Sequence, residues 1–202
     1  MTLQVLLSSA TLSLLLGVCF GTLSSTRLKI SILSPCIEAI TFVLRAVPFF
    51  VQLLIVYFVL PDLCGFNLDP FPASVISLGL CSSGYVSQII RSGMNAIPLT
   101  QWETATTLGY TTFQTLRYII FPQLIKHILG PLSNELDALL KSTAIVSSIG
   151  MLELTRMGMN IVSREMQPVP IYLLVALFYV VMSALLNLLA RFLEKRLSYA
   201  KS

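Results

Sequence analysis

The chain has 202 residues, of which 55% are hydrophobic and 11% are charged, and its formal net charge is +4. A soluble domain of this length needs far more charge on its surface, so this composition and the mean hydropathy of +0.85 exclude that class and indicate an integral membrane protein. The positive balance is explained by where the charges lie relative to the membrane, and it does not indicate a nucleic-acid partner.

Five apolar segments predict transmembrane helices, because a helix needs about 20 residues to cross a bilayer. They lie at 3–23, 40–60, 71–90, 123–146 and 171–190. The first contains no charged side chain, whereas Arg45 and Pro48 interrupt the second. We expect the whole chain, 1–202, to form one all-α membrane domain.

The polar loop 94–122 separates the third and fourth segments and carries two helix-start patterns. Thr100 precedes Glu103 by three residues, and Thr111 precedes Gln114 by the same interval. Each is the spacing of a capping box, in which the hydroxyl accepts from a backbone N–H and the later side chain reaches back. The loop is therefore expected to contain two short helices.

Gly109 is expected to end the first of these helices, because glycine adopts the left-handed C-cap conformation without a Cβ penalty. Pro122 is expected to end the second helix, since it has no N–H to donate. Phe113, Leu116 and Ile120 share one face of that helix and are predicted to anchor the loop to the bundle. Two short helices outside the bilayer indicate a docking element for a partner protein.

The fourth segment is apolar enough to cross, yet it contains five polar titratable side chains: Lys126, His127, Glu135, Asp137 and Lys141. Charges at membrane depth are costly and normally face protein or a water-filled cavity. This helix is therefore predicted to lie inside a bundle. The Gly130-Pro131 pair is expected to kink or break it, as in the interrupted helices that line transport sites.

Five spans place the two termini on opposite sides of the membrane. With the loop 94–122 in the cytoplasm, ten of the thirteen basic residues lie inside: Arg27, Lys29, Arg45, Arg91, Arg117, Lys126, Arg191, Lys195, Arg196 and Lys201. This is the distribution that the positive-inside rule expects. The N-terminus is predicted outside and the C-terminus inside.

Nothing in the sequence indicates an enzyme or a metal site. There is no G-x-x-x-x-G-K-[ST] loop for a nucleotide, and His127 is the only histidine. The four cysteines are far apart, and the methionines near the fourth span are better explained as packing residues than as copper ligands. We expect no catalytic residue and no cofactor or metal bound by this chain.

Part of the polar loop resembles the EAA signature of permease subunits in bacterial ABC importers. Glu103, Thr104 and Ala105, then Gly109, then the run IIFP ending at Pro122 follow its form: E-A-A, three residues, G, and later I-x-L-P. Thr104 stands where the signature has its first alanine, a small change that still lets a partner approach closely.

Flanking segments resemble the polar amino-acid permeases within this group. RAVP at 45–48, VQL at 51–53 and SGYVSQIIR at 83–91 are similar to R-G-T-P, V-Q-L and G-A-Y-x-A-E-I-x-R of that family. Gln88 stands where the last of these has an acid, which removes a charge. The resemblance covers nearly the whole chain, although the chain lacks the family's short leader, and a start upstream of Met1 stays open.

The resemblance implies a transport subunit of the bacterial inner membrane. It implies that the loop forms a coupling helix in a groove of a separate ATPase subunit, which holds ATP and Mg²⁺. It also implies a second permease chain, identical or related, and an extracytoplasmic binding protein that delivers an amino acid. Glu103 would offer a negative charge to an arginine of the ATPase. The alternative is that Glu103 serves only as the capping-box partner of Thr100.

The predicted substrate pathway lies on the fourth span. Asn134, Asp137 and Lys141 share one helical face, and a zwitterionic amino acid needs both an acceptor and a donor. The alternative is that Asp137 and Lys141 pair with each other and merely neutralise a buried charge. Glu135 adds a second acid, which weakly favours a basic or glutamine-like cargo.

Two other classes of function stay open from the sequence. A secondary transporter or channel subunit would need no ATPase, and a structural membrane assembly protein would need no charges in its fourth span. Co-purification with an ATPase would separate both from an ATP-driven permease.

Overall fold

The computed structural model describes residues 1–28 and 33–199, and these form helices and turns with no strand among them. Lys29 and Lys201, two of the basic residues assigned to the inner side, lie outside the described residues. The helices are α1 (Thr2–Leu23), α2 (Leu33–Ala46), α3 (Phe49–Leu54), η1 (Ile55–Val59), α4 (Leu60–Cys64), α5 (Pro70–Ala96), α6 (Leu99–Thr107), α7 (Thr112–Thr115), η2 (Leu116–Ile120), α8 (Phe121–Ser142), η3 (Thr143–Ile149), α9 (Leu154–Glu165) and α10 (Pro168–Tyr199). Of these, η1 and η2 are π-helical and η3 is a 3₁₀-helix.

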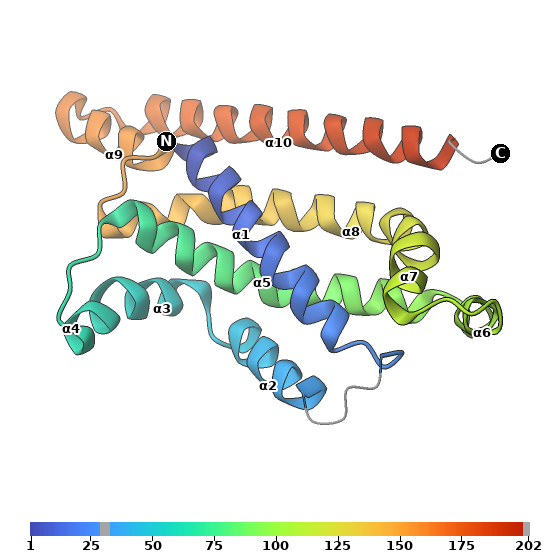
Figure 1. Ribbon diagram of the computed structural model, residues 1–202. Helices are drawn as coiled ribbons and strands as arrows, with labels where there is room; N and C mark the ends of the chain where they lie inside the picture. Colours follow the sequence, from blue (N-terminus) through green and yellow to red (C-terminus); the bar gives the residue numbers. More distant parts are fainter. Residues whose placement is uncertain (29–32, 200–202) are drawn as a thin grey trace.

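Helices α1, α5 and α8 form the centre of the bundle (Figure 1). Helix α1 lies against α5 along its length because glycines let the two backbones approach closely. A Cβ placed on Gly21 would lie 2.6 Å from both the Ile90 Cβ and the Ser87 carbonyl oxygen, and one on Gly17 would lie 2.5 Å from a Val86 methyl. Small residues at such a crossing are the usual basis of helix association in lipid, where apolar burial alone gives little preference.

Two apolar clusters follow α5 from end to end. One contains fully buried Leu53, Leu140 and Val146 and gathers α1, α3, α5, α8 and η3. The other contains Met94 and Ile120, both 0% exposed, and joins α5 to η2 and the start of α8. The polar loop packs against this second cluster through Trp102, Leu116 and Ile119.

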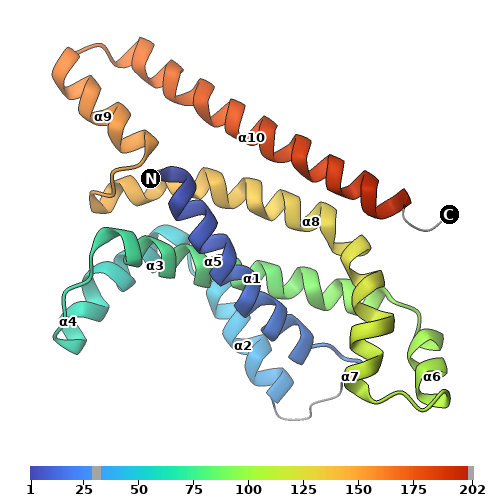
Figure 2. The same ribbon diagram turned by 45° about the horizontal axis from the view of Figure 1, so that its top comes forward.

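The loop helices α6 and α7 lie at the same end of the bundle as the C-terminus, and the N-terminus lies at the other end near α9 (Figures 1 and 2). Helix α10 runs along the outside of the bundle, and none of its most apolar stretch is buried. Its apolar side chains are therefore available to lipid or to another membrane chain.

In the part of the chain that the structure describes, three helices are long and apolar enough to cross a membrane, and two bent pairs raise the number to five if each pair is one span. Among them, α1, α5 and α10 match the predicted segments 3–23, 71–90 and 171–190. The second predicted segment is the bent pair α2 and α3–α4, whose two parts meet at 99°. The interruption expected at Pro48 is confirmed, and Pro48 is the N-cap of α3.

The Gln52 side chain stabilises this bend. Its amide donates to the carbonyl oxygens of Leu44 at 2.7 Å and Val47 at 2.8 Å. These are carbonyls at the end of α2, which lose their helical partners where Pro48 interrupts the chain. The Gln52 side chain therefore supplies the donor that these two carbonyls need next to Pro48, which has no N–H of its own.

Of the kink or break expected at Gly130-Pro131, the break is wrong. Helix α8 is continuous from Phe121 to Ser142 with Pro131 inside it, because one missing N–H removes one bond of the ladder and membrane helices tolerate such losses. The bend on this segment, 48°, lies instead between η3 and α9, where Gly150 has a φ of +83°.

Two expectations about the loop are also corrected. The Thr100–Glu103 capping box does not form, because Pro98 is the N-cap and α6 begins one residue before Thr100. Pro122 does not end a helix: α7 continues through η2 into α8, and Pro122 lies in the first turn of α8, just after the π-helical turn η2. Because this turn already departs from the regular i→i−4 ladder, a residue without an N–H is accommodated there.

Candidate functional site

Helix α6 is a nine-residue helix whose end is closed by Gly109. Gly109 has a φ of +78°, its N–H donates to the Thr106 carbonyl at 3.0 Å, and the Tyr110 N–H donates to the Ala105 carbonyl at 3.0 Å. These two bonds form a Schellman motif, so the C-cap role expected of Gly109 is confirmed.

The outer surface of α6 carries Glu103 and Thr104, both exposed. Ala105, which was expected on that surface, is 0% exposed and packs inward. Its small size thus lets α6 approach the rest of the protein. The exposed residues of α6 are Leu99, Thr100, Gln101, Glu103, Thr104, Thr106 and Thr107.

The second loop helix begins with the expected capping box. The Thr111 hydroxyl accepts from the Gln114 N–H at 3.3 Å, and the Gln114 side chain accepts from the Thr111 N–H at 2.9 Å. Ile120 and Leu116 pack into the cluster below, as predicted. Phe113 does not, since 70% of it is exposed.

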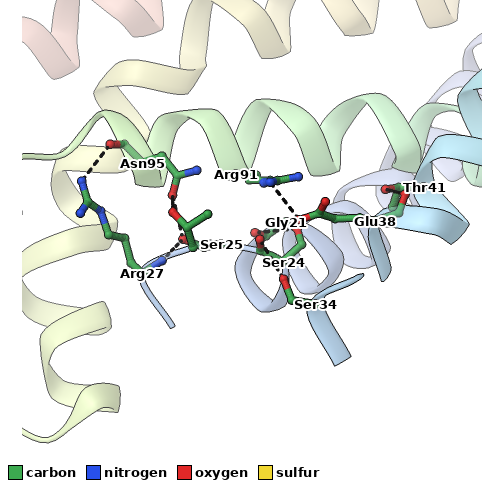
Figure 3. Close-up of polar contacts among 10 residues, drawn as sticks. Gly21, Ser24, Ser25, Arg27, Ser34, Glu38, Thr41, Arg91 and Asn95 are labelled. Carbon is green, nitrogen blue, oxygen red and sulfur yellow. Dashed lines mark hydrogen bonds and ion pairs between the residues drawn. The ribbon is translucent and has the colours of Figure 1, made fainter. Parts of the chain in front are cut away.

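The α1–α2 connection is fastened to the end of α5 beside this loop, a feature that the sequence did not reveal. Asn95 Oδ1 accepts from the hydroxyls of Ser25 at 3.1 Å and Thr26 at 3.0 Å, and the Arg27 guanidinium donates to the Asn95 carbonyl at 3.4 Å (Figure 3). One turn earlier on α5, Arg91 pairs with Glu38 of α2 at 2.9 Å (Figure 3). The Asn95 contacts join the segment after α1 to the end of α5, and the ion pair joins α2 to α5.

A half-open cavity of about 280 Å³ lies where α2, α3, α5 and α8 meet. Its wall includes Arg45, Ser82, Tyr85 and Glu135. Ser82 donates to a Glu135 carboxylate oxygen at 2.7 Å and accepts from Ser13 of α1 at 2.9 Å. Since no ion pair among the described residues includes Glu135, the carboxylate is held by the Ser82 hydroxyl and not by a cation.

Asp137 and Lys141 lie on a different side of α8 from this cavity. Their side chains form the i,i+4 ion pair that the sequence allowed as an alternative, with an N–O distance of 2.6 Å, and Ser183 of α10 also donates to Asp137. Asn134 is exposed. Of the four residues predicted to line a substrate pathway, Glu135 alone is part of the cavity wall.

Glu153 is a buried carboxylate at the start of α9, with 1% of the residue exposed. It accepts from the backbone N–H groups of Thr155 at 2.9 Å and Arg156 at 2.6 Å, and from the Tyr179 hydroxyl at 3.0 Å. It therefore both caps α9 and ties that helix to α10. No sequence pattern at Glu153 pointed to this role.

Comparison with known proteins agrees with this geometry. Residues 14–199 match the family described as binding-protein-dependent transport system inner membrane component. The chain is 35% identical over 97% of its length to the arginine transport system permease protein ArtQ of Bacillus subtilis, of which it covers 89%. It is 34% identical over 77% of its length to the glutamine transport system permease protein GlnP of Escherichia coli (strain K12), of which it covers 71%.

Among solved structures, an amino acid ABC transporter crystallised with histidines superposes with a TM-score of 0.86 at 36% identity, over 97% of this chain and 90% of that one. The match extends through the loop helices as well as the spans, since nearly the whole chain is covered. The chain therefore belongs to the family of binding-protein-dependent transport system inner membrane components.

Proposed function

We propose that the chain is the permease subunit of an ATP-driven amino-acid importer. The relatives are named as permease proteins for arginine and glutamine, which supports an amino-acid cargo here. In this proposal the chain forms the path through the membrane, and ATP and Mg²⁺ are bound by a separate ATPase subunit. The chain itself catalyses no reaction.

The proposed topology has five spans, with each bent pair counted as one, the N-terminus outside and the C-terminus inside. Its support is that α6 and the C-terminal end of α10 lie at one end of the bundle, opposite the N-terminus (Figure 2). Arg27 lines a cavity together with residues of α6, and Arg91 lies near the end of α5 that precedes α6, which is the distribution that the positive-inside rule expects of a cytoplasmic face.

The single observation that carries the coupling role is the geometry of α6: a short exposed helix bounded by Pro98 and by the left-handed Gly109. Such a helix projects from the bundle, and its threonines let a partner surface come close. Glu103 would offer a carboxylate to a basic residue of the ATPase, while Gly109 ends α6 and Pro122 lies where the loop 94–122 passes into α8.

Two permease chains, identical or related, would pair in the membrane with two ATPase subunits below them. ATP binding would close the ATPases, draw the two α6 helices together and turn the pathway outward, where a binding protein delivers the amino acid. This requires the ATPase to bind the two permease states with different affinities, because a partner without that preference shifts no equilibrium.

The proposed pathway runs through the cavity around Glu135. A zwitterion needs a donor for its carboxylate and an acceptor for its ammonium, and the wall supplies both in Arg45 and Glu135. The Glu135 carboxylate lacks an ion-pair partner among the described residues, so a cationic cargo would neutralise it. Asn134, Asp137 and Lys141, on the adjoining side of α8, remain a prediction for the same pathway.

Reconstitution tests this function directly. The chain is purified with its ATPase and placed in vesicles with a binding protein, and uptake of arginine, glutamine and histidine is measured with and without ATP. We expect uptake only with ATP. Uptake driven by an ion gradient without the ATPase would instead identify a secondary transporter, and assembly without any uptake would favour a structural subunit.

A further inference from the structure

Two hydroxyls in the centre of the bundle form a hydrogen-bonded chain that ends on Glu135. The Ser13 hydroxyl of α1 donates to the Ser82 hydroxyl of α5 at 2.9 Å, and the Ser82 hydroxyl donates to Glu135 of α8 at 2.7 Å. The three helices are neighbours at the centre of the bundle (Figure 1). Ser13 is 1% exposed and Ser82 is 4% exposed, so these bonds are largely shielded from solvent.

Other buried serines of the same two helices bond differently. Ser9 of α1 and Ser77 of α5 each donate to a carbonyl four positions back in their own helix, at 2.6 and 2.7 Å. This local bond is the one that a serine inside a helix ordinarily makes. Ser13 and Ser82 instead donate to a neighbouring helix, so their bonds depend on how the three helices are arranged.

Ser13 orients the Ser82 hydroxyl. A carboxylate can only accept, and a hydroxyl has one proton, so the proton of Ser82 is the one that bonds Glu135. The proton in the other bond must then come from Ser13. Ser13 therefore occupies the Ser82 oxygen as a donor and leaves the Ser82 proton directed at the carboxylate.

Two opposite charges line the cavity around Glu135 without pairing. Arg45 and Glu135 both belong to its wall, yet no ion pair among the described residues includes either of them. Each is bound by an uncharged group: Arg45 Nε donates to the Thr41 carbonyl at 3.2 Å, and Glu135 accepts from Ser82. Opposite charges attract strongly where the dielectric constant is low, so these neutral contacts oppose an ion pair across the cavity.

A second cavity, of about 300 Å³ and lined mostly by leucines, adjoins the first at Ser82 and Glu135. Both residues belong to the walls of both cavities. A carboxylate that is free of Ser82 gains nothing by turning toward the leucines, because an unpaired charge in an apolar setting is costly. We therefore expect a released carboxylate to turn toward Arg45.

We propose that Ser82, oriented by Ser13, is a positioning residue that holds the Glu135 carboxylate apart from Arg45 and leaves both charges open to the cargo. A hydroxyl does this without neutralising the carboxylate, which a lysine or arginine in its place would do. The cargo that replaces the missing ion pair is a zwitterionic amino acid. The role in transport rests on the proposed function, whereas the separation of the two charges does not.

Ser82→Ala tests the role in transport. The cargo must then displace Arg45 from Glu135, so the KM for arginine uptake by the complete transporter should rise about tenfold, the usual effect of one hydrogen bond to a charged group. The matched control is Ser77→Ala, the same change at a buried serine of α5 that bonds within its own helix. It should keep the wild-type KM.

Ser13→Ala distinguishes positioning from packing. It should raise the KM in the same direction but less, because Ser82 keeps its proton and loses only the bond that orients it. In a chain that already has Ser82→Ala, the change at Ser13 should have no further effect, since Ser13 acts through Ser82. Ser9→Ala is the control on α1. An effect of Ser13→Ala that persists without the Ser82 hydroxyl would overturn the positioning role.

The separation of the charges is measured without transport, by thermal unfolding of the full chain in lipid nanodiscs. Arg45→Gln, Glu135→Gln and the double variant are compared in the wild type and in Ser82→Ala. In the wild type the two shifts in unfolding temperature should add, because the residues form no pair. In Ser82→Ala the double variant should shift less than the sum, because either single change already breaks the new ion pair.

Additive shifts in the Ser82→Ala chain would overturn the inference, as would an unchanged KM for arginine in that variant. The two proposals fail separately. A chain that shows the expected unfolding pattern but takes up no amino acid with ATP refutes the proposed function only. A chain that transports amino acids equally well with and without the Ser82 hydroxyl refutes this inference only.

Discussion

The Tyr110 N–H donates to the carbonyl of Ala105 over 3.0 Å, and this bond closes the C-terminal end of α6. It forms only because the intervening Gly109 has a φ of +78°, and nothing lies within 4 Å of where its Cβ would be. The constraint at Gly109 is therefore one of backbone conformation and not of space. It fixes where α6 stops and how the chain turns into α7.

Gly109→Val should impair coupling through this turn. A β-branched residue in the left-handed region costs about 1–2 kcal/mol, which the chain avoids by unwinding the end of α6. We expect ATP-dependent uptake to fall several-fold, whereas Gly109→Asn, which tolerates this conformation, should stay near the wild-type rate. Unchanged uptake by the valine variant, with the ATPase still bound, would speak strongly against the coupling role.

Glu135→Gln should reduce arginine uptake more than Asp137→Asn does. The Glu135 carboxylate lines the cavity without a cation partner among the described residues, whereas Asp137 already pairs with Lys141. A glutamine in place of Glu135 is uncharged but can still accept from the Ser82 hydroxyl, so the expected loss, about tenfold, reflects the missing charge. Initial uptake rates at matched expression decide the order, and a larger effect at Asp137 would place the pathway on the side of α8 that carries Asp137.

Glu153→Ala should destabilise the contact between α9 and α10. The substitution removes the cap of α9 and the bond from the Tyr179 hydroxyl, which keeps only Thr155 at 3.1 Å as a partner; the loss should cost about 1–2 kcal/mol. Tyr179→Phe removes the second contact only and should cost less. Thermal unfolding in detergent measures both, and equal midpoints for the alanine variant and the wild type would refute the role assigned to Glu153.

Gly21→Val should separate α1 from α5. Its side chain would enter space held by Ile90 and by the Ser87 carbonyl, each 2.6 Å from the new Cβ, and the backbone carbonyl cannot move aside cheaply. Overpacking of this kind costs about 1–3 kcal/mol. Leu15→Val, at a position of α1 that is 69% exposed, is the control and should leave the unfolding temperature within error of the wild type.

The sequence was informative where local chemistry decides the structure. Thr111 and Gln114 form their capping box, Gly109 ends α6, and Pro48 interrupts the second apolar segment, because each effect acts within a few residues of the chain. At Thr100 two local signals competed. Pro98 is the N-cap of α6, so Thr100 already lies inside the helix and cannot form a capping box with Glu103.

The parts that could not be predicted depend on contacts between distant segments. Whether Pro131 breaks α8 depends on its neighbours in the bundle, and which side of α8 meets the cavity depends on α5 and α10. The helical spacing predicted that Asp137 lines the pathway. In the structure the cavity lies on the side of α8 that carries Glu135, which bonds to Ser82, 53 positions away in the sequence. The Asn95 contacts with the α1–α2 connection are likewise invisible in any local pattern.

The central claim is that α6 faces the cytoplasm and is the surface that an ATPase subunit covers. It is tested most directly with a single cysteine at the exposed Thr107, in a chain whose four native cysteines are replaced. A membrane-impermeant thiol reagent should label Thr107→Cys in inside-out vesicles but not in right-side-out ones, and bound ATPase should protect it. Labelling from the outer face, or full labelling while the ATPase is bound, would contradict the account.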